Sequence, residues 1–373
     1  MRKKILIIIG ILFLVFFGKV IITTLRLSPV LFQLIFNNKV EIKKSDGNIN
    51  VLLLGIGGGS HDGTNLSDTM IFASIDQAKN KVTLVSIPRD LWIPNVTDSH
   101  GGRINEAYAD GEEIKKGGGL ILAEATVSKV LGQPIDYGIR VDFAGFVKAV
   151  DMVGGLDVIV DNTFDDNIYP IEGKEADSCG KTDAAIQEFT KTASASAEQN
   201  LAMFFPCRYQ HIHFDKGLNH MNGTEALEFV RSRHAVGSEG TDFARSARQQ
   251  KVIKAAKDKV LSLGILLNPG KVMGLYDILQ NSIDTDINQN EFDDFIRLAD
   301  KMKGATITNT VLDYGDPEIG RPGLLINPVP SADYGYAWVL IPRIGLGNYS
   351  EIAKYMNCEI TVGNCTISKK PTY

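Results

Sequence analysis

The chain has 373 residues, enough for one large domain or two ordinary ones, and 44% of them are hydrophobic and 22% charged. This balance is normal for a globular protein. The formal net charge of −5 argues against nucleic acid as a partner, and we expect none, although a local basic patch is compatible with it.

The N-terminus has the pattern of an uncleaved membrane anchor. Basic residues at 2–4 precede an apolar stretch from Ile5 to about Thr23, interrupted only by Lys19. At about 1.5 Å of rise per residue, a helix of this length nearly spans a hydrocarbon core. No small-x-small cleavage site is evident, so we favour a retained anchor over a removed signal peptide. The basic flank should stay in the cytoplasm, which places the residues beyond about 25 on the extracytoplasmic side of the membrane.

A glycine-rich loop, GIGGGSHDGTNLSDTM at 55–70, follows an apolar run that is typical of a buried strand. The Rossmann pattern fails because it requires glycine where Ser60 stands. The P-loop pattern can start at Gly58, but Thr64 stands where the phosphate-binding lysine is required. The remaining alternatives are a mobile surface loop and a different kind of phosphate site.

Strands and helices alternate along the first half of the chain, which favours an α/β sandwich. The strands are expected at 49–56, 70–75, 81–87, 135–141 and 156–160, and the helices at 119–131 and from 143 to about 150.

The second half begins with a polar segment, 161–222, which we interpret as an insertion or a long lid. A helix is expected at 222–231, where Asn222 can cap it and Glu225 follows three residues later. Further helices are expected from Thr241 onward, over 291–302 and over 350–356, and a strand is expected at 339–342.

Four cysteines fall into two sequence-local pairs, Cys179 with Cys207 and Cys358 with Cys365. Outside the cytosol, a disulfide within each pair is the natural expectation, and two free buried pairs are the alternative. The spacings match no common zinc pattern. Disulfides would indicate an oxidising compartment, where ATP is not available.

An arginine cluster is the most unusual chemical feature. Arg231, Arg233, Arg245 and Arg248 lie within a short stretch, and Arg245 shares a helix face with Gln249. Arg231 and Arg233 point the same way only if the chain is extended there. Guanidinium groups suit bidentate binding of phosphate oxygens. The alternative is a solvated basic surface with acidic partners such as Glu239 and Asp242.

Two further groups, the Arg89–Asp90 pair and Asp68, are candidates for the same phosphate site. Arg89 and Asp90 follow a predicted strand, at the edge where ligands of α/β sheets usually bind. Asp90 could orient Arg89 or act as a base, or the two could form a surface ion pair of little energetic value. Asp68 precedes the next strand and suits Mg²⁺, which bridges carboxylate and phosphate oxygens.

Taken in order, LLLGI, SDTM, VSIPRD, RINEAYADG, GGLDV, NGTEALEFVRSR and DFARSARQQ resemble the LytR–CpsA–Psr family from about 49 to about 262. The resemblance implies an αβα sandwich with a central mixed β-sheet and a hydrophobic tunnel for a polyprenyl chain. It also implies a phosphotransferase that moves a glycopolymer from a polyprenyl-pyrophosphate carrier to a peptidoglycan sugar hydroxyl. No nucleotide is needed, because the lipid-linked donor already carries the energy.

By motif matching, the resemblance implies pyrophosphate-binding and catalytic positions at Arg89, Arg231, Arg233, Arg245 and Gln249. It implies Asp68 as the carboxylate near Mg²⁺ (or Mn²⁺). Supporting or catalytic positions with less defined functions are Asp90, Arg103, Asn105 and Asp242.

The chain departs from the family at Gly57, where relatives often carry an aspartate. We hypothesise that Asp62 supplies the second metal-binding carboxylate beside Asp68. The alternative is that Asp68 binds the metal alone. Histidines of the polar segment, at 211, 213 and 220, are a less favoured place for a metal.

The expected organisation is a basic tip and single transmembrane helix at 1–25, a juxtamembrane linker at 26–48, and an extracytoplasmic catalytic domain at 49–302. Residues 303–373 would form an extension or complete the core. Two other functions remain open for the same site. One is a hydrolase, in which water replaces the sugar hydroxyl, and the other is a non-catalytic module that binds polyprenyl phosphate.

Overall fold

The computed structural model describes residues 41–59, 63–97, 100–191, 198–260, 275, 278, 282–316 and 320–371. The expected anchor at 1–25 lies outside these residues, as does most of the juxtamembrane linker. Within the described ranges, no helix has both the length and the apolar character needed to cross a membrane.

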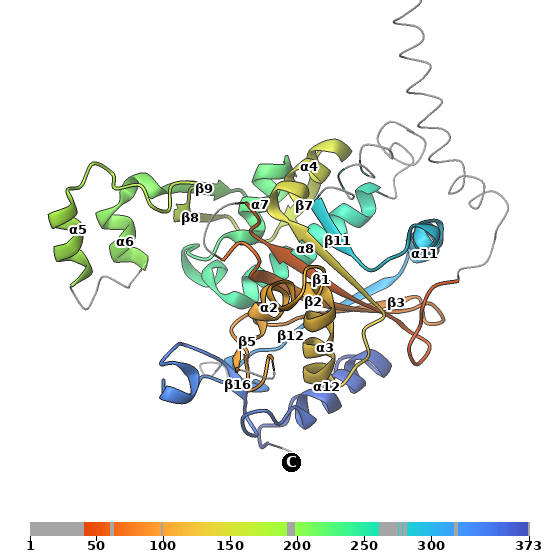
Figure 1. The fold of residues 1–373 in the computed structure, drawn as a ribbon. Coiled ribbons are helices and arrows are strands. Elements are labelled where there is room, and N and C mark those ends of the chain that lie inside the picture. Colours follow the sequence, from red (N-terminus) through yellow and green to blue (C-terminus); the bar gives the residue numbers. More distant parts are fainter. Residues whose placement is uncertain are drawn as a thin grey trace, which may run out of the picture.

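A six-stranded mixed sheet forms the centre of the molecule, in the order β11-β6-β1-β2-β3-β12 (Figure 1). The strands are β1 (Ile49–Ile56), β2 (Ser67–Asp76), β3 (Lys81–Ser86), β6 (Tyr137–Asp142), β11 (Ile283–Thr285) and β12 (Thr306–Val311). Parallel pairs are β1 with β6 and β3 with β12, and the other neighbours run antiparallel. The predicted α/β fold with a central mixed sheet is confirmed.

Both faces of this sheet are covered, which explains why β1 is an almost continuous apolar run. Leu52 and Leu54 belong to one buried cluster, whereas Ile49 and Val51, which point to the opposite face of the strand, belong to another. The first cluster contains side chains of α2 (Ala107–Ile114), α3 (Gly119–Leu131) and α12 (Ser350–Thr361), and the second contains Leu298 of α11 (Phe292–Lys301). The strand therefore separates two layers of packed side chains.

A third cluster lies beside the sheet and is built around the turn that carries two of the predicted arginines. It contains side chains of α4 (Phe143–Val153), β7 (Leu156–Val160), β10 (Gly217–Met221), α7 (Gly223–Arg231) and α8 (Asp242–Val260). Asn222 and Glu225 form the expected capping box at the start of α7. Gly223 permits the close approach of α4, because a Cβ atom there would lie 2.2 Å from the Val147 carbonyl oxygen.

An arm projects from this part of the molecule (Figure 1). Its strands, β8 (Phe164–Pro170) and β9 (Tyr209–Phe214), pair antiparallel, and its helices are α5 (Asp183–Thr190) and α6 (Glu198–Phe204), with the turn η2 (Pro206–Arg208). Cys179 and Cys207 form a disulfide that joins the two sides of the arm. Phe164 and Phe214 at its base are buried in the third cluster, so the paired strands anchor the polar arm in the core.

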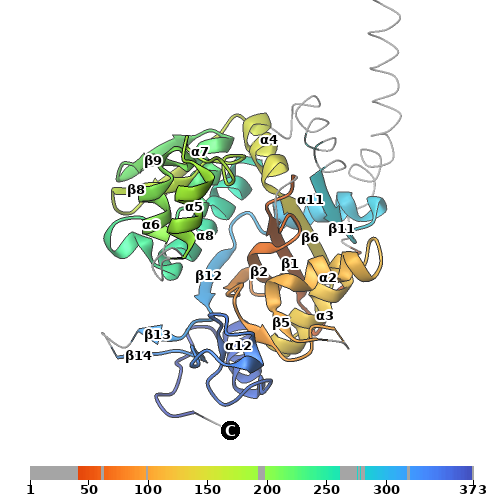
Figure 2. The same cartoon turned by 60° about the vertical axis from the view of Figure 1, so that its left-hand side comes forward.

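The C-terminal segment completes the core. β12 is an edge strand of the central sheet, and α12 packs near α3, where a Cβ atom on Gly132 would lie 2.6 Å from that of Ala353. Figure 2 shows β13 (Gly315–Asp316), β14 (Arg321–Pro322) and α12 grouped at the end toward which β12 points. The remaining short elements are β4 (Trp92–Ile93), β5 (Gly102–Arg103), η1 (Ile104–Glu106), η3 (Gly237–Gly240), η4 (Gln289–Glu291), β15 (Leu325–Ile326), η5 (Ala332–Tyr334) and β16 (Ile341–Pro342).

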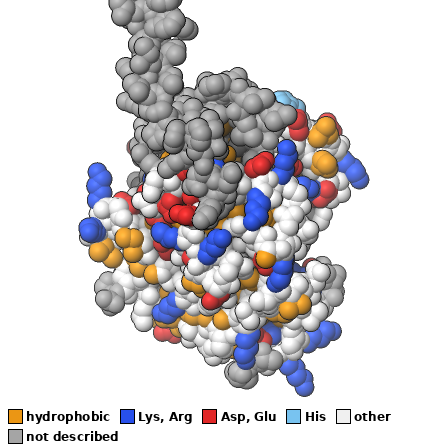
Figure 3. Space-filling model, turned by 90° about the vertical axis from the view of Figure 1, so that its right-hand side faces the viewer, with side chains coloured by type: hydrophobic (Ala, Val, Ile, Leu, Met, Phe, Trp, Pro, Cys, Tyr) orange, Lys and Arg blue, Asp and Glu red, His pale blue; other side chains and the backbone are white. Residues whose placement is uncertain are grey.

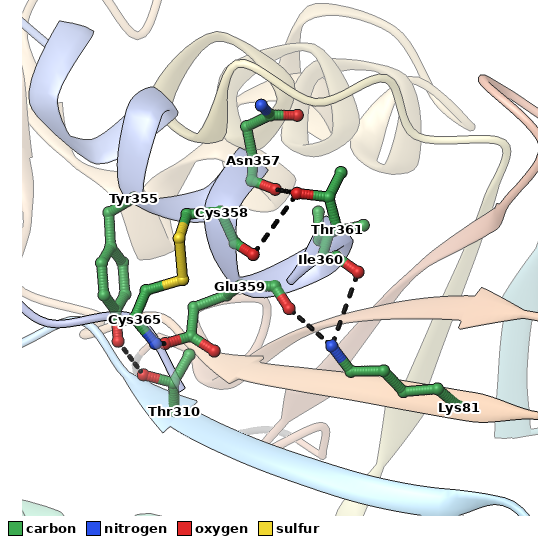
Figure 4. Close-up of a disulfide and its surroundings, with 9 residues drawn as sticks. All are labelled: Lys81, Thr310, Tyr355, Asn357, Cys358, Glu359, Ile360, Thr361 and Cys365. Atoms are coloured by element: carbon green, nitrogen blue, oxygen red, sulfur yellow. Dashed lines mark hydrogen bonds between the residues drawn. A yellow bond between two sulfur atoms is a disulfide. The ribbon is translucent and has the colours of Figure 1, made fainter. Parts of the chain in front are cut away.

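The end of α12 is fastened to the sheet by polar contacts (Figure 4). The Lys81 ammonium donates to the carbonyl oxygens of Glu359, at 2.7 Å, and Ile360, at 3.5 Å. A cation is favourable at the negative end of a helix dipole. Cys358 forms a disulfide with Cys365 immediately beside this contact. Both disulfides join the pairs expected from the sequence.

Candidate functional site

One cavity brings together the principal residues expected from the sequence. It has a volume of about 140 Å³, and its lining includes, from four separate stretches of the chain, Asp68, Arg89, Arg231, Arg233, Arg245 and Gln249. Four guanidinium groups therefore line one small space. On the described part of the face in Figure 3, by contrast, basic side chains are dispersed among acidic and apolar ones.

The sheet register brings Asp68 and Arg89 together. β2 and β3 run antiparallel with Ile71 opposite Ser86, so the start of β2 lies beside the residues that follow β3. The Arg89 guanidinium forms a close ion pair with Asp68, through Nη1 and Oδ1. The Asp68 side chain keeps 38% of its surface exposed, so its carboxylate is still accessible from the cavity.

Asp90 lies between two guanidinium groups. Its Oδ2 is 3.6 Å from Nε of Arg89, and its Oδ1 is 3.3 Å from Nε of Arg103. The pairing of β4 with β5 places Trp92 opposite Arg103 and so brings the second arginine to this position. Of the two functions considered for Asp90, this geometry favours orientation of Arg89.

Backbone contacts hold the Arg89–Asp90 turn from behind. The Asn105 amide donates to the Arg89 carbonyl at 3.4 Å, and the Leu340 amide donates to the Asp90 carbonyl at 2.9 Å. Arg103 also donates to the Trp338 carbonyl at 3.2 Å. Asn105 is buried and, like Arg103, is not among the residues that line the cavity. Both therefore support the site from outside the cavity, Asn105 through its backbone amide and Arg103 through its guanidinium group.

The chain is extended between Arg231 and Arg233, as their convergence requires. Arg231 ends α7, and Ser232 leaves the helix with φ −49° and ψ 129°. The fully buried Asp166 of β8 fixes this turn, because its Oδ2 accepts from the Ser232 hydroxyl at 2.8 Å and from the His234 amide at 3.2 Å. Both arginines consequently line the same cavity.

Arg231 is also held by aromatic rings. Its guanidinium carbon lies 4.3 Å from the ring centre of Phe143 and 5.9 Å from that of Tyr169. Burial raises the pKa of Tyr169 to about 12, despite the opposing charge of Arg231. The Tyr169 hydroxyl therefore stays protonated at neutral pH and can donate to an anion.

Helix α8 contributes Arg245 and Gln249 from one face. Gln249 donates from Nε2 to the Thr69 hydroxyl at 3.1 Å, which joins α8 to β2 next to Asp68. Arg245 lines both this cavity and the one beside it. Spacing along the helix thus predicted this pair correctly as a shared face.

Arg248 does not belong to the anion site, although the sequence places it in the arginine cluster. Only 3% of Arg248 is exposed. It donates to the carbonyl oxygens of Phe229, at 2.8 Å, Ser232, at 2.6 Å, and Glu239, at 2.7 Å. These include backbone acceptors at the end of α7 that have no partner within the helix. Arg248 therefore holds the arginine-bearing turn against α8.

The metal hypothesis falls partly outside the described residues. Asp62 is not described, and neither is the side chain of Asp242. β1 runs parallel to β6 with Ile56 opposite Asp142, and a Cβ atom on Gly58 would lie 2.9 Å from that of Asp142. Asp142 is therefore a carboxylate beside the glycine-rich loop that the motif comparison missed. Its position between a strand and a predicted helix is the signal that could have drawn attention to it.

The cavity adjoins two others that extend toward the C-terminal segment. The second shares Asp68 and Arg89 and also includes Tyr314 and Trp338. A third, of about 800 Å³, shares Tyr314 with the second and includes Lys251. Exposed fractions of 49% for Tyr314 and 46% for Trp338 leave both rings accessible. Shared lining residues thus connect the arginine cavity to the cleft that contains the exposed aromatic rings.

This arrangement, a cleft lined by several guanidinium groups on a mixed α/β fold, has the chemistry that suits an anionic ligand. The chain belongs to the LytR_cpsA_psr family, whose family model matches residues 32–317.

Curated relatives include transferases from two bacteria. The chain is 30% identical over 256 residues to the polyisoprenyl-teichoic acid–peptidoglycan teichoic acid transferase TagU of Bacillus cereus, with 69% of this chain and 66% of that protein covered. For TagU of Oceanobacillus iheyensis the identity is 30% over 253 residues, with coverage of 67% and 62%. The chain thus spans just under two thirds of the length of these relatives.

Solved structures share the fold. TagV of Bacillus subtilis superposes with a TM-score of 0.54 at 24% identity, covering 85% of this chain and 98% of that one. TagT bound to LI-WTA superposes with a TM-score of 0.52 at 20% identity, covering 86% and 95%.

Proposed function

We propose that the protein is a phosphotransferase that moves a glycopolymer from a polyprenyl-pyrophosphate carrier to a sugar hydroxyl of peptidoglycan. The observation that carries the proposal is the convergence of Asp68, Gln249 and four arginines on one cavity. The names of the TagU relatives, which describe transfer of teichoic acid from a polyisoprenyl carrier to peptidoglycan, support the same substrate classes.

The arginines supply the main chemical requirement. The acceptor oxygen attacks the phosphorus that bears the glycopolymer and forms a phosphodiester, while the bond to the bridging pyrophosphate oxygen breaks and polyprenyl phosphate leaves with its electron pair. Charge builds on the phosphate oxygens during this step. Guanidinium donors that are already in place stabilise that charge without reorganisation. Tyr169 offers one further donor.

The acceptor hydroxyl must also lose its proton. Asp68 and Asp90, the carboxylates of the second cavity that pair with Arg89, are the candidates for accepting it. The acceptor sugar enters through this cavity, where Tyr314 and Trp338 offer flat apolar faces to a sugar ring. Donor and acceptor then meet at the boundary between the two cavities.

Mg²⁺ (or Mn²⁺) fits the donor set of the first cavity. Asp68 is an accessible carboxylate among phosphate-binding groups, and Mg²⁺ typically binds through one or two carboxylates plus substrate phosphates. Asp68 would hold the ion, with Asp62 as the second carboxylate of our hypothesis. The ion would add positive charge opposite the pyrophosphate.

The expected anchor at 1–25 would hold the enzyme in the cell membrane, with its N-terminus cytoplasmic and its site outside. Two disulfides in the described part of the chain support an oxidising compartment. The lipid carrier would then lie in the same membrane as the anchor.

Incubation of the purified full-length chain with a lipid-linked glycopolymer and peptidoglycan tests the function. We expect mass spectrometry to detect polymer joined to peptidoglycan together with polyprenyl phosphate, and we expect Arg231→Ala to abolish both. Free phosphorylated polymer would indicate the hydrolase. Unchanged donor that stays bound to the chain would indicate the non-catalytic binding module.

A further inference from the structure

We propose that Asp165, His211 and His213 bind a divalent transition-metal ion of the Zn²⁺ class at the base of the β8–β9 arm. These residues line neither the arginine cavity nor the cleft that contains Trp338. The site is therefore distinct from the proposed Mg²⁺ position and does not depend on the proposed function.

The two strands place the three side chains on one face. His211 and His213 are two residues apart on β9, so both point to the same side of the hairpin. Asp165 of β8 lies directly opposite His213 in the antiparallel register. Side chains of directly opposed residues are close enough to share a ligand.

The ligand atoms already converge. His211 Nε2 and His213 Nδ1 each lie 2.8 Å from Asp165 Oδ1, and all three atoms lie within 4.8 Å of one another. Two imidazole nitrogens and one carboxylate oxygen are a donor set that Zn²⁺ accepts, with a fourth position left for water. All three side chains are partly exposed, so an ion can enter from solvent.

Asp215 provides a second observation in favour of a metal. Its Oδ1 lies 3.3 Å from Nε2 of His213, the ring nitrogen that faces away from Asp165. A carboxylate on the far nitrogen of a histidine fixes the ring orientation and strengthens the metal-binding nitrogen. Asp215 and His213 therefore form a carboxylate–histidine pair, and the other ring nitrogen of His213, Nδ1, faces Asp165.

Other groups of similar composition in the described residues lack one of these features. His220 pairs with Asp157 at 2.7 Å, but that pair offers only two ligands. Asp177 lies near Cys179 and Cys207, but those two sulfurs form a disulfide and so offer no thiolate.

The ion would clamp β8 to β9 where β8 supports the arginine-bearing turn. The Asp165 carbonyl accepts from the Val236 amide at 2.9 Å, and the adjacent Asp166 holds Ser232 and His234. Binding at Asp165 should therefore stabilise the base of the arm against unfolding.

Calorimetric titration of the full-length, chelator-treated chain with ZnCl₂, in the presence of excess MgCl₂, tests the site. We expect one Zn²⁺ per chain and a higher Tm with Zn²⁺. The double variant His211→Ala/His213→Ala should lose both effects, and Asp215→Asn should bind about 10- to 100-fold more weakly. The matched control, His220→Ala, should bind as the unaltered chain does.

Zn²⁺ binding that survives in the double variant, or that is lost in the control, would overturn the assignment, as would no binding at all. Circular dichroism checks that each variant is folded. If the double variant does not fold, X-ray absorption of the zinc-loaded unaltered chain decides the question, because the site requires two histidine nitrogens on the metal. A spectrum without histidine ligands would contradict the proposal.

Discussion

Arg89, which follows β3, and Asp68, at the start of β2, form an ion pair in the lining of the arginine cavity. The pair keeps a guanidinium and a carboxylate side by side where a pyrophosphate would bind. Because the Asp68 carboxylate and the Arg89 guanidinium hold each other in place, loss of either residue should disturb the position of the other.

The first prediction concerns Arg89 itself. Arg89→Lys keeps the charge but loses the planar fork that binds phosphate oxygens in pairs. We expect turnover to fall by about 10²- to 10³-fold, the usual effect of removing one preorganised donor to a charged transition state. Steady-state transfer kinetics measure it. Lys115→Arg, at an exposed basic residue that lines none of the three cavities, is the control, and equal losses in both variants would contradict a specific function for Arg89.

The second prediction separates two arginines that the sequence groups together. Arg248→Met should destabilise the fold by about 3–5 kcal/mol, since it leaves Glu239 and buried carbonyls without their donor. Arg233→Met removes an exposed side chain from the cavity and should leave stability nearly unchanged while transfer is lost. Denaturant unfolding curves measure the first effect. A stable Arg248→Met chain would refute its structural function.

The third prediction is a pH dependence of stability. Burial, followed by the negative charges of Asp286 and Asp284, raises the pKa of Glu124 from its ordinary value of 4.5 to about 7. Between these values the folded chain retains a proton that the unfolded chain releases. The contribution of Glu124 to folding stability must therefore fall as the pH rises from about 4.5 to about 7.

Glu124→Gln removes this titration, so we expect the unfolding free energy of the variant to decline less steeply over that pH range. Glu113→Gln replaces an exposed glutamate on α2 and serves as the control. Urea titrations at several pH values compare the three chains. Identical slopes for Glu124→Gln and the unaltered chain would show that Glu124 ionises normally.

The fourth prediction concerns the acceptor. Trp338→Ala should raise KM for the peptidoglycan acceptor with little change for the lipid-linked donor, because Trp338 lines the second cavity but not the arginine cavity. Tyr336→Ala, an exposed aromatic residue two positions away that does not line the cleft, is the matched control. A rise confined to the donor KM would place the acceptor elsewhere.

The fifth prediction tests the metal hypothesis at the glycine-rich loop. Chelation should reduce transfer, and Asp62→Ala should weaken the dependence of turnover on Mg²⁺. Asp142→Asn is the comparison, since Asp142 lies beside Gly58 but caps α4 through the Gly145 amide at 2.6 Å. An unchanged rate and metal dependence in Asp62→Ala would rule out Asp62, and an effect confined to Asp142→Asn would assign the second carboxylate there.

Parts of the fold could be predicted because local signals agree with tertiary packing. The strand at 49–56 was predicted with its observed bounds, since burial on both faces demands an apolar run. The helix at 119–131 also has its observed bounds, because Gly132 adopts the left-handed conformation that ends it. Segments whose apolar period matches their burial are the most predictable.

Strands β8, β9 and β10 were missed for a physical reason. They expose alternate residues and are polar, and β8 and β9 pair across the long arm. Only tertiary partners stabilise such strands, so local sequence carries little signal.

The site was predictable in composition but not in orientation. Arg245 and Arg248 are both on α8, yet Arg245 lines the arginine cavity and Arg248 is buried against the end of α7. The rotation of a helix follows from packing that no motif contains. The position of Trp338 could not be predicted either, since an isolated β-bridge between Leu91 and Leu340 brings this distant segment to Asp90.

A crystal structure of the chain with a polyprenyl pyrophosphate tests the central claim most directly. We predict that the pyrophosphate lies in the arginine cavity, within hydrogen-bond distance of Arg89, Arg231 and Arg245. A pyrophosphate bound elsewhere, with these three guanidinium groups uninvolved, would contradict the assignment of the site and the function proposed for it.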